Sequence, residues 1–306
     1  MDGGGAMIRI ATRRSALALC QAHYVSALLQ SREPQLEIRL HDLTTEGDRA
    51  DALGQPEPRG KGRYVRELQH ALLVGDADLA VHALKDLPTD GDPRLSLGAI
   101  PPRSDPSDAL CATAQRSLEQ LPTGARVGTS SLRRAAQLRA ARPDLAIVPV
   151  QGSLESRLAR VGAELDAVVV AYAGLVRLGL EAQATQVFTP EQMLSACGQG
   201  SLAVEARRDD PIQLERLARI DDREAHLMAL AERSTLRQLG IHCEAPVAVL
   251  ASLKGEELTL YALVAAPDGS EILRSRRSGP AALLGKIARG VAQDLVAQGA
   301  HKLLGK

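Results

Sequence analysis

Short apolar runs alternate along the chain with stretches whose apolar residues recur every three or four positions. Residues 8–12 and 37–43 show the first pattern and are predicted to be strands. Between them, residues 15–30 show the second pattern and are predicted to form a helix capped by Ser15. The apolar face of this helix is expected to contain Leu17, Cys20, Tyr24 and Leu28.

A long polar stretch, residues 44–62, follows these elements and is rich in Gly, Pro and charged residues. Because it is long for a loop in a compact domain, it is expected to be a lid or an unstructured segment. A helix over about 63–74 and a strand over 78–82 come next. This alternation favours a mixed or parallel sheet flanked by helices.

Part of this pattern recurs further along the chain. Residues 126–131 are predicted to be a strand that ends in Thr and Ser residues, and a helix to about Ala141 follows. Residues 143–148 start with a proline and are predicted to be a second strand. Residues 9–38 follow the same order. Either the chain contains two similar lobes that face one cleft, or two ordinary βαβ units resemble each other by chance.

The remaining segments indicate two linkers and a further domain. Residues 166–171 are almost purely apolar and are predicted to be a buried strand. The Pro-rich residues 101–106 are expected to link the two lobes. Residues 191–205 are expected to be a second segment in which the chain passes from one lobe to the other. Beyond them a small α+β domain is predicted, with a helix from Asp221 to about Leu239, strands over 257–266 and 271–276, and a helix over 281–298.

Composition narrows the class of protein. The 306 residues are enough for two or three domains, and 45% are hydrophobic although only 2% are aromatic. A net charge of zero argues against a nucleic-acid-binding protein defined by its overall charge. The four cysteines have neither zinc-site nor disulfide-scaffold spacing, and Cys20 and Cys111 are expected to be small core residues. With no apolar stretch long enough to cross a bilayer, the protein is expected to be soluble and cytoplasmic.

Polar groups gather where predicted strands end. Thr129, Ser130 and Ser131 lie at a strand-to-helix turn, where hydroxyls and free N–H groups can bind an anion. The neighbouring Arg133 and Arg134 suit carboxylates, since guanidinium groups bind them in a bidentate manner. The alternative is ordinary helix capping with arginines that face solvent.

Three further sites have a functional and a structural interpretation. Lys85 and Asp86 follow a strand, where open α/β sheets place ligand-binding groups, but they could form a surface salt bridge. Arg13 and Ser15 occupy the equivalent place in the first lobe, or simply cap a surface helix. Cys243 lies in a predicted loop, where a thiol can carry a covalent group or be incidental.

Together these segments resemble the porphobilinogen deaminase (hydroxymethylbilane synthase) family. The resemblance covers nearly the whole chain from Ile8, and Thr129–Arg134 with Lys85–Pro88 are specific in combination. The segments that carry it, in order, are Ile10–Ser15, Gly60–Gly62, Ala80–His82, Leu84–Pro88, Val127–Arg134, Ala173–Leu175, Arg177–Leu180, Gly198–Gly200 and Cys243.

The resemblance implies an α/β fold of three domains. Two are lobes with mixed sheets, similar to those of periplasmic-type binding proteins, and the third is a small C-terminal α+β domain. The implied boundaries are 7–101 with 202–219 for the first lobe, 106–194 for the second, and 221–306 for the cofactor-attachment domain.

The resemblance also implies a reaction and its residues. Four porphobilinogen molecules would be joined head to tail on a dipyrromethane cofactor that is thioether-linked to Cys243, with loss of ammonia at each step and release of hydroxymethylbilane. Asp86 would be catalytic because it could stabilise the cation left by ammonia. The implied cofactor-binding residues are Lys85, Thr129, Ser130, Ser131, Arg133, Arg134 and Arg157, and the implied substrate-binding residues are Arg13, Ser15, Gln151 and Gln199. A cytoplasmic monomer without a metal, a membrane or a nucleic-acid partner is expected.

Several positions depart from the family pattern. Ala83 replaces Ser, Gln151 replaces Arg, Tyr64 replaces Phe, Ile241-His242 replaces Gly-Gly, and Glu57-Pro58 interrupts the usual lid sequence. Two interpretations follow: an active enzyme, or a paralogue that binds a pyrrole or another polycarboxylate but polymerises it poorly. A periplasmic solute-binding protein would need a signal peptide, and a ligand-sensing regulator would need a DNA-binding segment. Neither segment is expected here.

Overall fold

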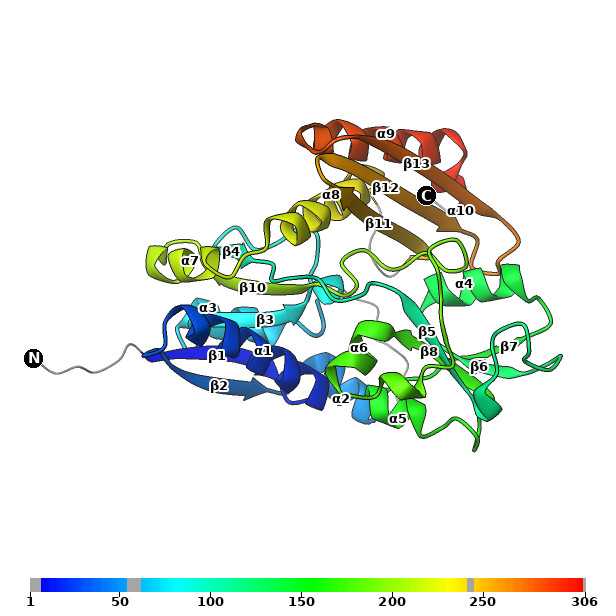
Figure 1. Ribbon diagram of the computed structural model, residues 1–306, viewed down its shortest axis with the longest axis horizontal. Coiled ribbons are helices and arrows are strands. Elements are labelled where there is room, and N and C mark those ends of the chain that lie inside the picture. Colours follow the sequence, from blue (N-terminus) through cyan, green and yellow to red (C-terminus); the bar gives the residue numbers. More distant parts are fainter. Residues whose placement is uncertain (1–6, 54–61, 241–244, 305–306) are drawn as a thin grey trace, which may run out of the picture. The chain divides into compact units, whose positions relative to one another are not determined.

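The computed structural model describes residues 7–53, 62–240 and 245–304 (Figure 1). The chain divides into two compact units. One contains the described residues up to Arg103 together with Ser201–His226, and the other contains Ser104–Gly200 together with the described residues from Leu227 onward.

The sheet of the first unit is mixed and has the strand order β2-β1-β3-β10-β4. Strand β1 is parallel to β2 and β3, whereas β10 is antiparallel to β3 and β4. The strands are β1 (Met7–Arg13), β2 (Glu37–Leu43), β3 (Leu79–Ala83), β4 (Leu95–Ala99) and β10 (Leu202–Arg207).

The larger sheet of the second unit repeats this topology. Its order is β7-β6-β8-β5-β9; β6 is parallel to β7 and β8, and β5 is antiparallel to β8 and β9. Strand for strand, order and orientation match the first sheet, so the structure confirms the predicted repeat. The strands are β5 (Asp108–Ala112), β6 (Arg126–Gly128), β7 (Ala146–Val148), β8 (Ala167–Ala171) and β9 (Gln186–Val187).

The helices of the two lobes connect or flank these strands. The helices are α1 (Ala16–Arg32), α2 (Glu46–Ala52), α3 (Arg66–Val74), α4 (Leu132–Ala141), α5 (Leu154–Leu158), α6 (Tyr172–Arg177) and α7 (Pro211–Ala218). Single-turn 3-10 helices occur at η1 (Leu84–Asp86), η2 (Thr113–Gln115) and η3 (Glu181–Gln183). The cores are mainly aliphatic, as composition requires: the only phenylalanine, Phe188, packs with residues such as Leu110 and Leu138.

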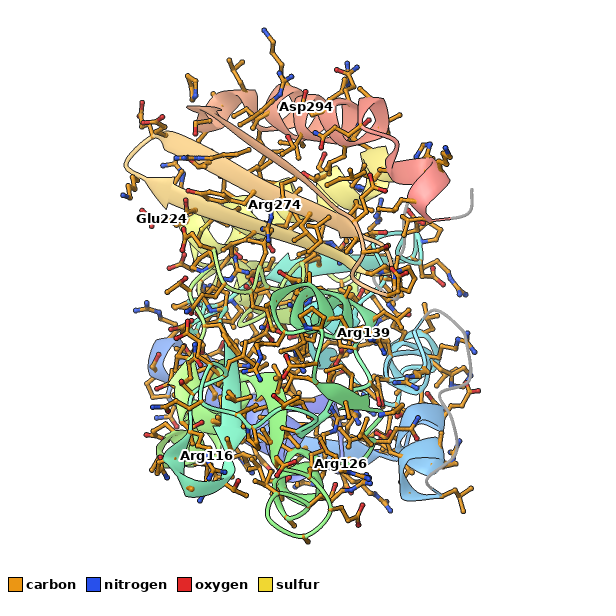
Figure 2. All side chains as sticks on the ribbon, turned by 90° about the vertical axis from the view of Figure 1, so that its right-hand side faces the viewer. Arg116, Arg126, Arg139, Glu224, Arg274 and Asp294 are labelled. Atoms are coloured by element: carbon orange, nitrogen blue, oxygen red, sulfur yellow. The ribbon has the colours of Figure 1, made fainter. Side chains whose placement is uncertain are left out.

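The C-terminal segment forms an antiparallel sheet of three strands, β11 (Val247–Lys254), β12 (Glu257–Ala265) and β13 (Ile272–Pro280). Residues of α8 (Arg223–Leu239) and α9 (Leu284–Ala297) share one apolar cluster with it. The short helices η4 (Ala281–Leu283) and α10 (Ala300–Leu303) come directly before and shortly after α9. Asp294, which lies on α9 and is labelled in Figure 2, accepts hydrogen bonds from Ser275 Oγ at 2.8 Å and from Arg277 Nη2 at 2.7 Å, both on β13. Together the sheets confirm the predicted fold class, two mixed-sheet lobes with a small α+β domain, while the three domain boundaries stay a prediction.

The buried face of α1 differs from the predicted one. Leu17 and Cys20 are only half-buried and Tyr24 is 41% exposed. The buried apolar residues are instead Ala18, Ala22, Val25 and Leu29. Both sets have helical spacing, and the set with the smaller side chains faces the sheet, so the spacing alone could not decide between the two faces.

The polar stretch predicted to be a loop contains helix α2. Thr45 Oγ1 accepts the N–H of Asp48 at 3.2 Å, and Asp48 Oδ2 accepts the N–H of Thr45 at 3.0 Å. This reciprocal capping box stabilises a helix start without an apolar pattern, which is why the prediction is wrong here. Residues 54–61 of that stretch lie outside the described residues.

Candidate functional site

The start of α4 lies at the carboxyl end of β6, as predicted. Ser131 caps the helix by accepting the N–H of Arg134 at 3.4 Å, and Thr129 Oγ1 accepts the N–H of Ser131 at 3.2 Å. Ser130 Oγ donates to the carbonyl of Val150 at 2.6 Å. The three hydroxyl groups therefore shape the strand-to-helix turn.

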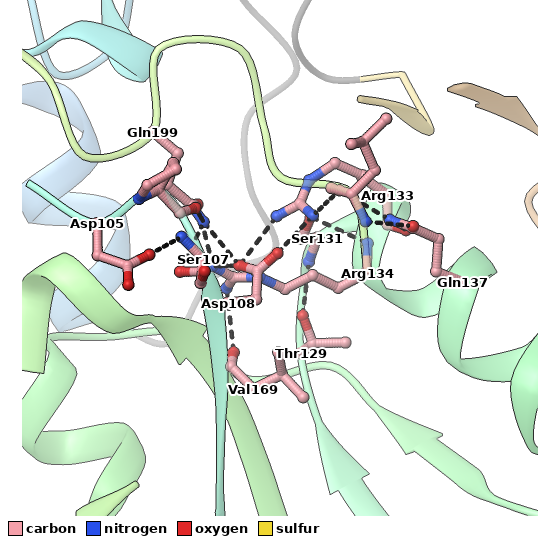
Figure 3. Close-up of polar contacts among 12 residues, drawn as sticks. Asp105, Ser107, Asp108, Thr129, Ser131, Arg133, Arg134, Gln137, Val169 and Gln199 are labelled. Atoms are coloured by element: carbon pink, nitrogen blue, oxygen red, sulfur yellow. Dashed lines mark hydrogen bonds and ion pairs between the residues drawn. The ribbon is translucent and has the colours of Figure 1, made fainter. Parts of the chain in front are cut away.

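The two arginines that follow point inward rather than toward solvent. Arg133 and Arg134 are 4% and 6% exposed, and both contact Asp108, which is fully buried (Figure 3). Arg133 Nη1 lies 2.6 Å from Asp108 Oδ2, and Arg134 Nε lies 2.8 Å from Asp108 Oδ1. The guanidiniums also donate to the carbonyls of Leu194 (2.7 Å) and Val169 (3.0 Å). The solvent-facing alternative is therefore wrong.

Asp108 was missed by the sequence analysis, although a signal was present. It begins the apolar strand β5, where a carboxylate needs a partner if it is buried. Because β5 runs antiparallel to β8, Asp108 pairs with Ala171 at the carboxyl end of β8. That edge of the sheet is where α/β folds place ligand-binding groups.

Gln199 joins the same cluster and is buried. Its Nε2 donates to Asp108 Oδ1 at 2.9 Å and to the carbonyl of Pro106 at 2.7 Å. The predicted substrate contact of Gln199 stays a prediction. In the structure, its side-chain amide connects the second crossing of the chain to the carboxylate that the arginines share (Figure 3).

The electrostatics of this cluster favour an additional anion. Burial alone would raise the pKa of Asp108, but the charges of Arg133 and Arg134 outweigh it and hold that pKa well below its usual range. Burial lowers the pKa of Arg134 and outweighs the charge and hydrogen bond of Asp108, which raise that pKa; the charges of Arg133 and Arg157 lower it further. Two buried guanidiniums and one carboxylate leave one positive charge, and Arg157 adds to it.

Arg157 and Gln151 lie on the segment between β7 and the end of α5. Arg157 is half-buried, and its Nε donates to the carbonyl of Gly152 at 2.8 Å. Gly152 has a φ of +105°, and a Cβ there would lie 2.4 Å from Ser156 Oγ, so this turn requires glycine. Gln151 is half-buried beside it.

In the first unit, η1 begins directly after β3 and contains both Lys85 and Asp86. Both side chains are half-buried at the carboxyl end of that parallel strand. Ser15 caps α1 by accepting the N–H of Ala18 at 3.3 Å. These positions agree with the predicted ones, and the predicted roles remain to be tested.

Arg13 is bound by neighbours of the same unit. Its Nε lies 3.1 Å from Asp48 Oδ1, and its guanidinium carbon lies 4.0 Å from the centre of the Tyr64 ring. Burial lowers the pKa of Arg13, but the hydrogen bond and charge of Asp48 and the charge of Asp86 outweigh this and raise it. Tyr64 in turn donates to Asp51 Oδ2 at 2.9 Å.

The predicted attachment residue Cys243 lies outside the described residues, as do Gly60, Lys61, Glu57, Pro58, Ile241 and His242.

Two family profiles match the chain. "Porphobilinogen deaminase, dipyromethane cofactor binding domain" matches residues 8–215, and "Porphobilinogen deaminase, C-terminal domain" matches residues 226–294. The chain belongs to the porphobilinogen deaminase family. The family resemblance inferred from the sequence is therefore confirmed.

Membership of the porphobilinogen deaminase family establishes the activity. The protein is a transferase of tetrapyrrole biosynthesis: it condenses four porphobilinogen molecules on a covalent dipyrromethane and releases ammonia and hydroxymethylbilane. Neither match favours the impaired paralogue.

The donor set fits this cofactor. Each pyrrole of a dipyrromethane carries carboxylate side chains. In the second unit, Arg133 and Arg134 share one buried aspartate, and the charge of Arg157 acts on Arg134. The unmatched positive charge of Arg133, Arg134 and Arg157 suits a group of that kind.

Some solved structures of other proteins match a large part of this chain at low sequence identity. A putative methionine-binding lipoprotein from Bacillus subtilis matches with 14% identity and a TM-score of 0.45, over 73% of this chain and 93% of its own. The reduced OxyR regulatory domain from Pseudomonas aeruginosa matches with 14% identity and a TM-score of 0.38, over 70% and 96%. At these scores the matches add nothing on function. Among the described residues, no helix is long and apolar enough to span a membrane.

Proposed function

We propose that Arg133, Arg134 and Arg157 bind the carboxylates of the dipyrromethane and of the growing pyrrole chain. The observation that supports this most directly is the buried excess of positive charge at the carboxyl edge of the second sheet. A buried charge without a partner is costly, so a site of this kind favours an anionic ligand. Thr129, Ser130 and Ser131 would add hydroxyl and N–H donors at the start of α4.

In the first unit we assign the catalytic role to Asp86. Loss of ammonia from the aminomethyl group of porphobilinogen leaves a cation, which a carboxylate can stabilise while it exchanges protons with the pyrrole nitrogen. Lys85 would bind a carboxylate of the cofactor. Arg13 and Ser15 would bind the carboxylates of the incoming substrate. The charge of Asp86 contributes to the raised pKa of Arg13, which supports an electrostatic connection between the two groups.

The remaining assignments complete the proposal. Gln151 and Gln199 would contact substrate, and the Cys243 thiol would hold the cofactor. When bound, the dipyrromethane would supply the free carbon to which the first pyrrole is joined, and each later pyrrole would be joined to the end of the growing chain. The domain boundaries of 7–101 with 202–219, 106–194 and 221–306 belong to this proposal, as does a monomer in the cytoplasm without a metal, nucleic-acid or membrane partner.

Two experiments test these assignments. Intact-protein mass spectrometry is expected to show two added pyrrole units, and Cys243→Ser is expected to lack them. The attachment joins one thiol and two porphobilinogens and releases two ammonia molecules. An unmodified, folded wild-type protein from a porphobilinogen-producing host would contradict the attachment.

The second experiment concerns catalysis. Asp86→Asn is expected to keep the fold and the adduct but to lower the rate of ammonia release by at least about 100-fold, the upper part of the range for acid–base and electrostatic groups. Asp144→Asn, which alters an exposed carboxylate, is the matched control. Turnover of Asp86→Asn within a few-fold of wild type would remove Asp86 from the mechanism.

A further inference from the structure

The carboxylate of Asp108 stands between the two arginines to which cofactor binding has been assigned. Its Oδ2 contacts Arg133 Nη1 at 2.6 Å, while its Oδ1 contacts Arg133 Nη2 at 3.2 Å and Arg134 Nη2 at 2.7 Å. One fully buried group therefore determines where both guanidiniums lie (Figure 3). Arg133 and Arg134 are adjacent in the sequence and repel each other.

Asp108 is itself held in place from two sides. Its backbone is part of the β5–β8 ladder, opposite Ala171. Its Oδ1 also accepts the amide of Gln199 at 2.9 Å, and that amide donates to the carbonyls of Pro106 and Ser107 as well. A carboxylate supported in this way can orient its partners without moving when a ligand arrives.

The charge of Asp108 is suited to this role because it reduces the repulsion without cancelling it. With no carboxylate, two buried guanidiniums would have no counter-charge and would tend to separate or to move toward solvent. With a second carboxylate, no charge would be left for a ligand. One aspartate allows the pair to be buried and still leaves one positive charge for a ligand carboxylate.

We propose that Asp108 is a positioning residue for the cofactor: it acts through Arg133 and Arg134 and keeps them in the arrangement that accepts a dipyrromethane carboxylate. This inference rests on the proposed role of the two arginines. Asp108 is given no direct contact with the cofactor or with substrate.

The test measures cofactor loading rather than turnover. Folded apo-protein is incubated with porphobilinogen, and the rate at which the adduct appears is followed by intact-protein mass spectrometry. Asp108→Asn keeps the shape and removes the charge, and it is expected to load at least about tenfold more slowly than wild type. Asp144→Asn removes an exposed aspartate that makes the same type of contact with Arg142 (2.8 and 2.7 Å), and it is expected to load within about twofold of wild type.

A double-mutant cycle separates positioning from general damage to the fold. If Asp108 acts through the arginines, Asp108→Asn should add little to the defect of Arg133→Gln, so the two effects will not multiply. The proposal would be overturned if the effects of the two substitutions on the loading rate multiplied fully. It would also be overturned if folded Asp108→Asn loaded the cofactor as fast as wild type.

Asp108→Asn could also fail to fold. In that case, Asp108→Asn/Arg134→Gln restores the charge balance of the cluster and is expected to fold and to load as Arg134→Gln alone does; a double variant that is as unstable as Asp108→Asn contradicts the proposal. Two controls keep the proposals distinct. Wild-type apo-protein that never acquires an adduct would contradict the attachment to Cys243, and normal loading by Arg133→Gln and Arg134→Gln would contradict the arginine assignment.

Discussion

The carboxylate of Glu232 offers the sharpest stability prediction. It is fully buried on α8 and accepts two backbone N–H groups, that of Gly198 at 2.6 Å and that of Ala251 at 2.8 Å. Ala251 belongs to β11, an edge strand of the C-terminal sheet, and Gly198 precedes the Gln199 that supports Asp108. One side chain therefore satisfies donors in two separate segments of the second unit.

The expected cost follows from the two hydrogen bonds. Glu232→Ala leaves both N–H groups buried without this acceptor, at about 1–3 kcal/mol each. Glu232→Gln keeps one oxygen acceptor but places an amide N–H₂ group opposite the other N–H donor. The free energy of unfolding is therefore expected to fall by about 1–3 kcal/mol in total. A loss of about 2 kcal/mol corresponds to a roughly 30-fold increase in the opening equilibrium of the affected amides.

Native-state hydrogen exchange read at single residues measures this directly. The amides of Gly198 and Ala251 should exchange at least about fivefold faster in Glu232→Gln, and faster still in Glu232→Ala. Glu224, an exposed glutamate near the start of the same helix, provides the control Glu224→Gln, which should leave both amides unchanged (Figure 2). Exchange of the two amides within about threefold of wild type in Glu232→Ala would refute the reasoning.

Three further predictions follow from single side chains. Tyr64→Phe removes the hydrogen bond to Asp51 but keeps the ring on Arg13, so unfolding should become easier by about 0.5–1.5 kcal/mol in urea titration, and no change would show that the bond contributes nothing. Burial raises the pKa of Cys111 to about 11, so its thiolate fraction at pH 8 is about 100-fold below that of an ordinary cysteine, and iodoacetamide should leave it unmodified in the native protein. Because the unfolded thiol ionises first, stability should fall between about pH 9 and 11, a fall that Cys111→Ala should remove. Gln151→Arg adds a cation to the proposed substrate site and should lower the Michaelis constant for porphobilinogen; an unchanged constant would remove position 151 from substrate binding.

Periodicity was enough to predict the repeated βαβ units and, in the C-terminal domain, two of the three strands and both long helices; β11 (Val247–Lys254) was not predicted. The helix caps are local, since Ser15 and Ser131 begin the helices that the sequence indicated. The polar groups that follow β3 in the first unit, and those that follow β6 in the second unit, were also predictable in position, because α/β folds place polar groups at the carboxyl ends of strands.

Features that depend on distant partners could not be predicted in this way. Arg133 and Arg134 are buried only because Asp108, 25 residues from Arg133, is brought beside them by an antiparallel strand. Neither their inward direction nor the importance of Asp108 can be read from local spacing. The capping box of α2 was local, but it lay in a stretch whose polar composition indicated a loop.

The placement of β10 has a consequence for biosynthesis on the ribosome. In the described part of the chain, β4 pairs only with β10, which begins at Leu202, about a hundred residues after β4 ends. The nascent first lobe must therefore wait, with β4 unpaired and one edge of β3 open, until translation has passed the strands of the second sheet. A chaperone that shields those strand edges would act during that interval, and a message truncated before codon 202 would yield a product that cannot complete its first domain.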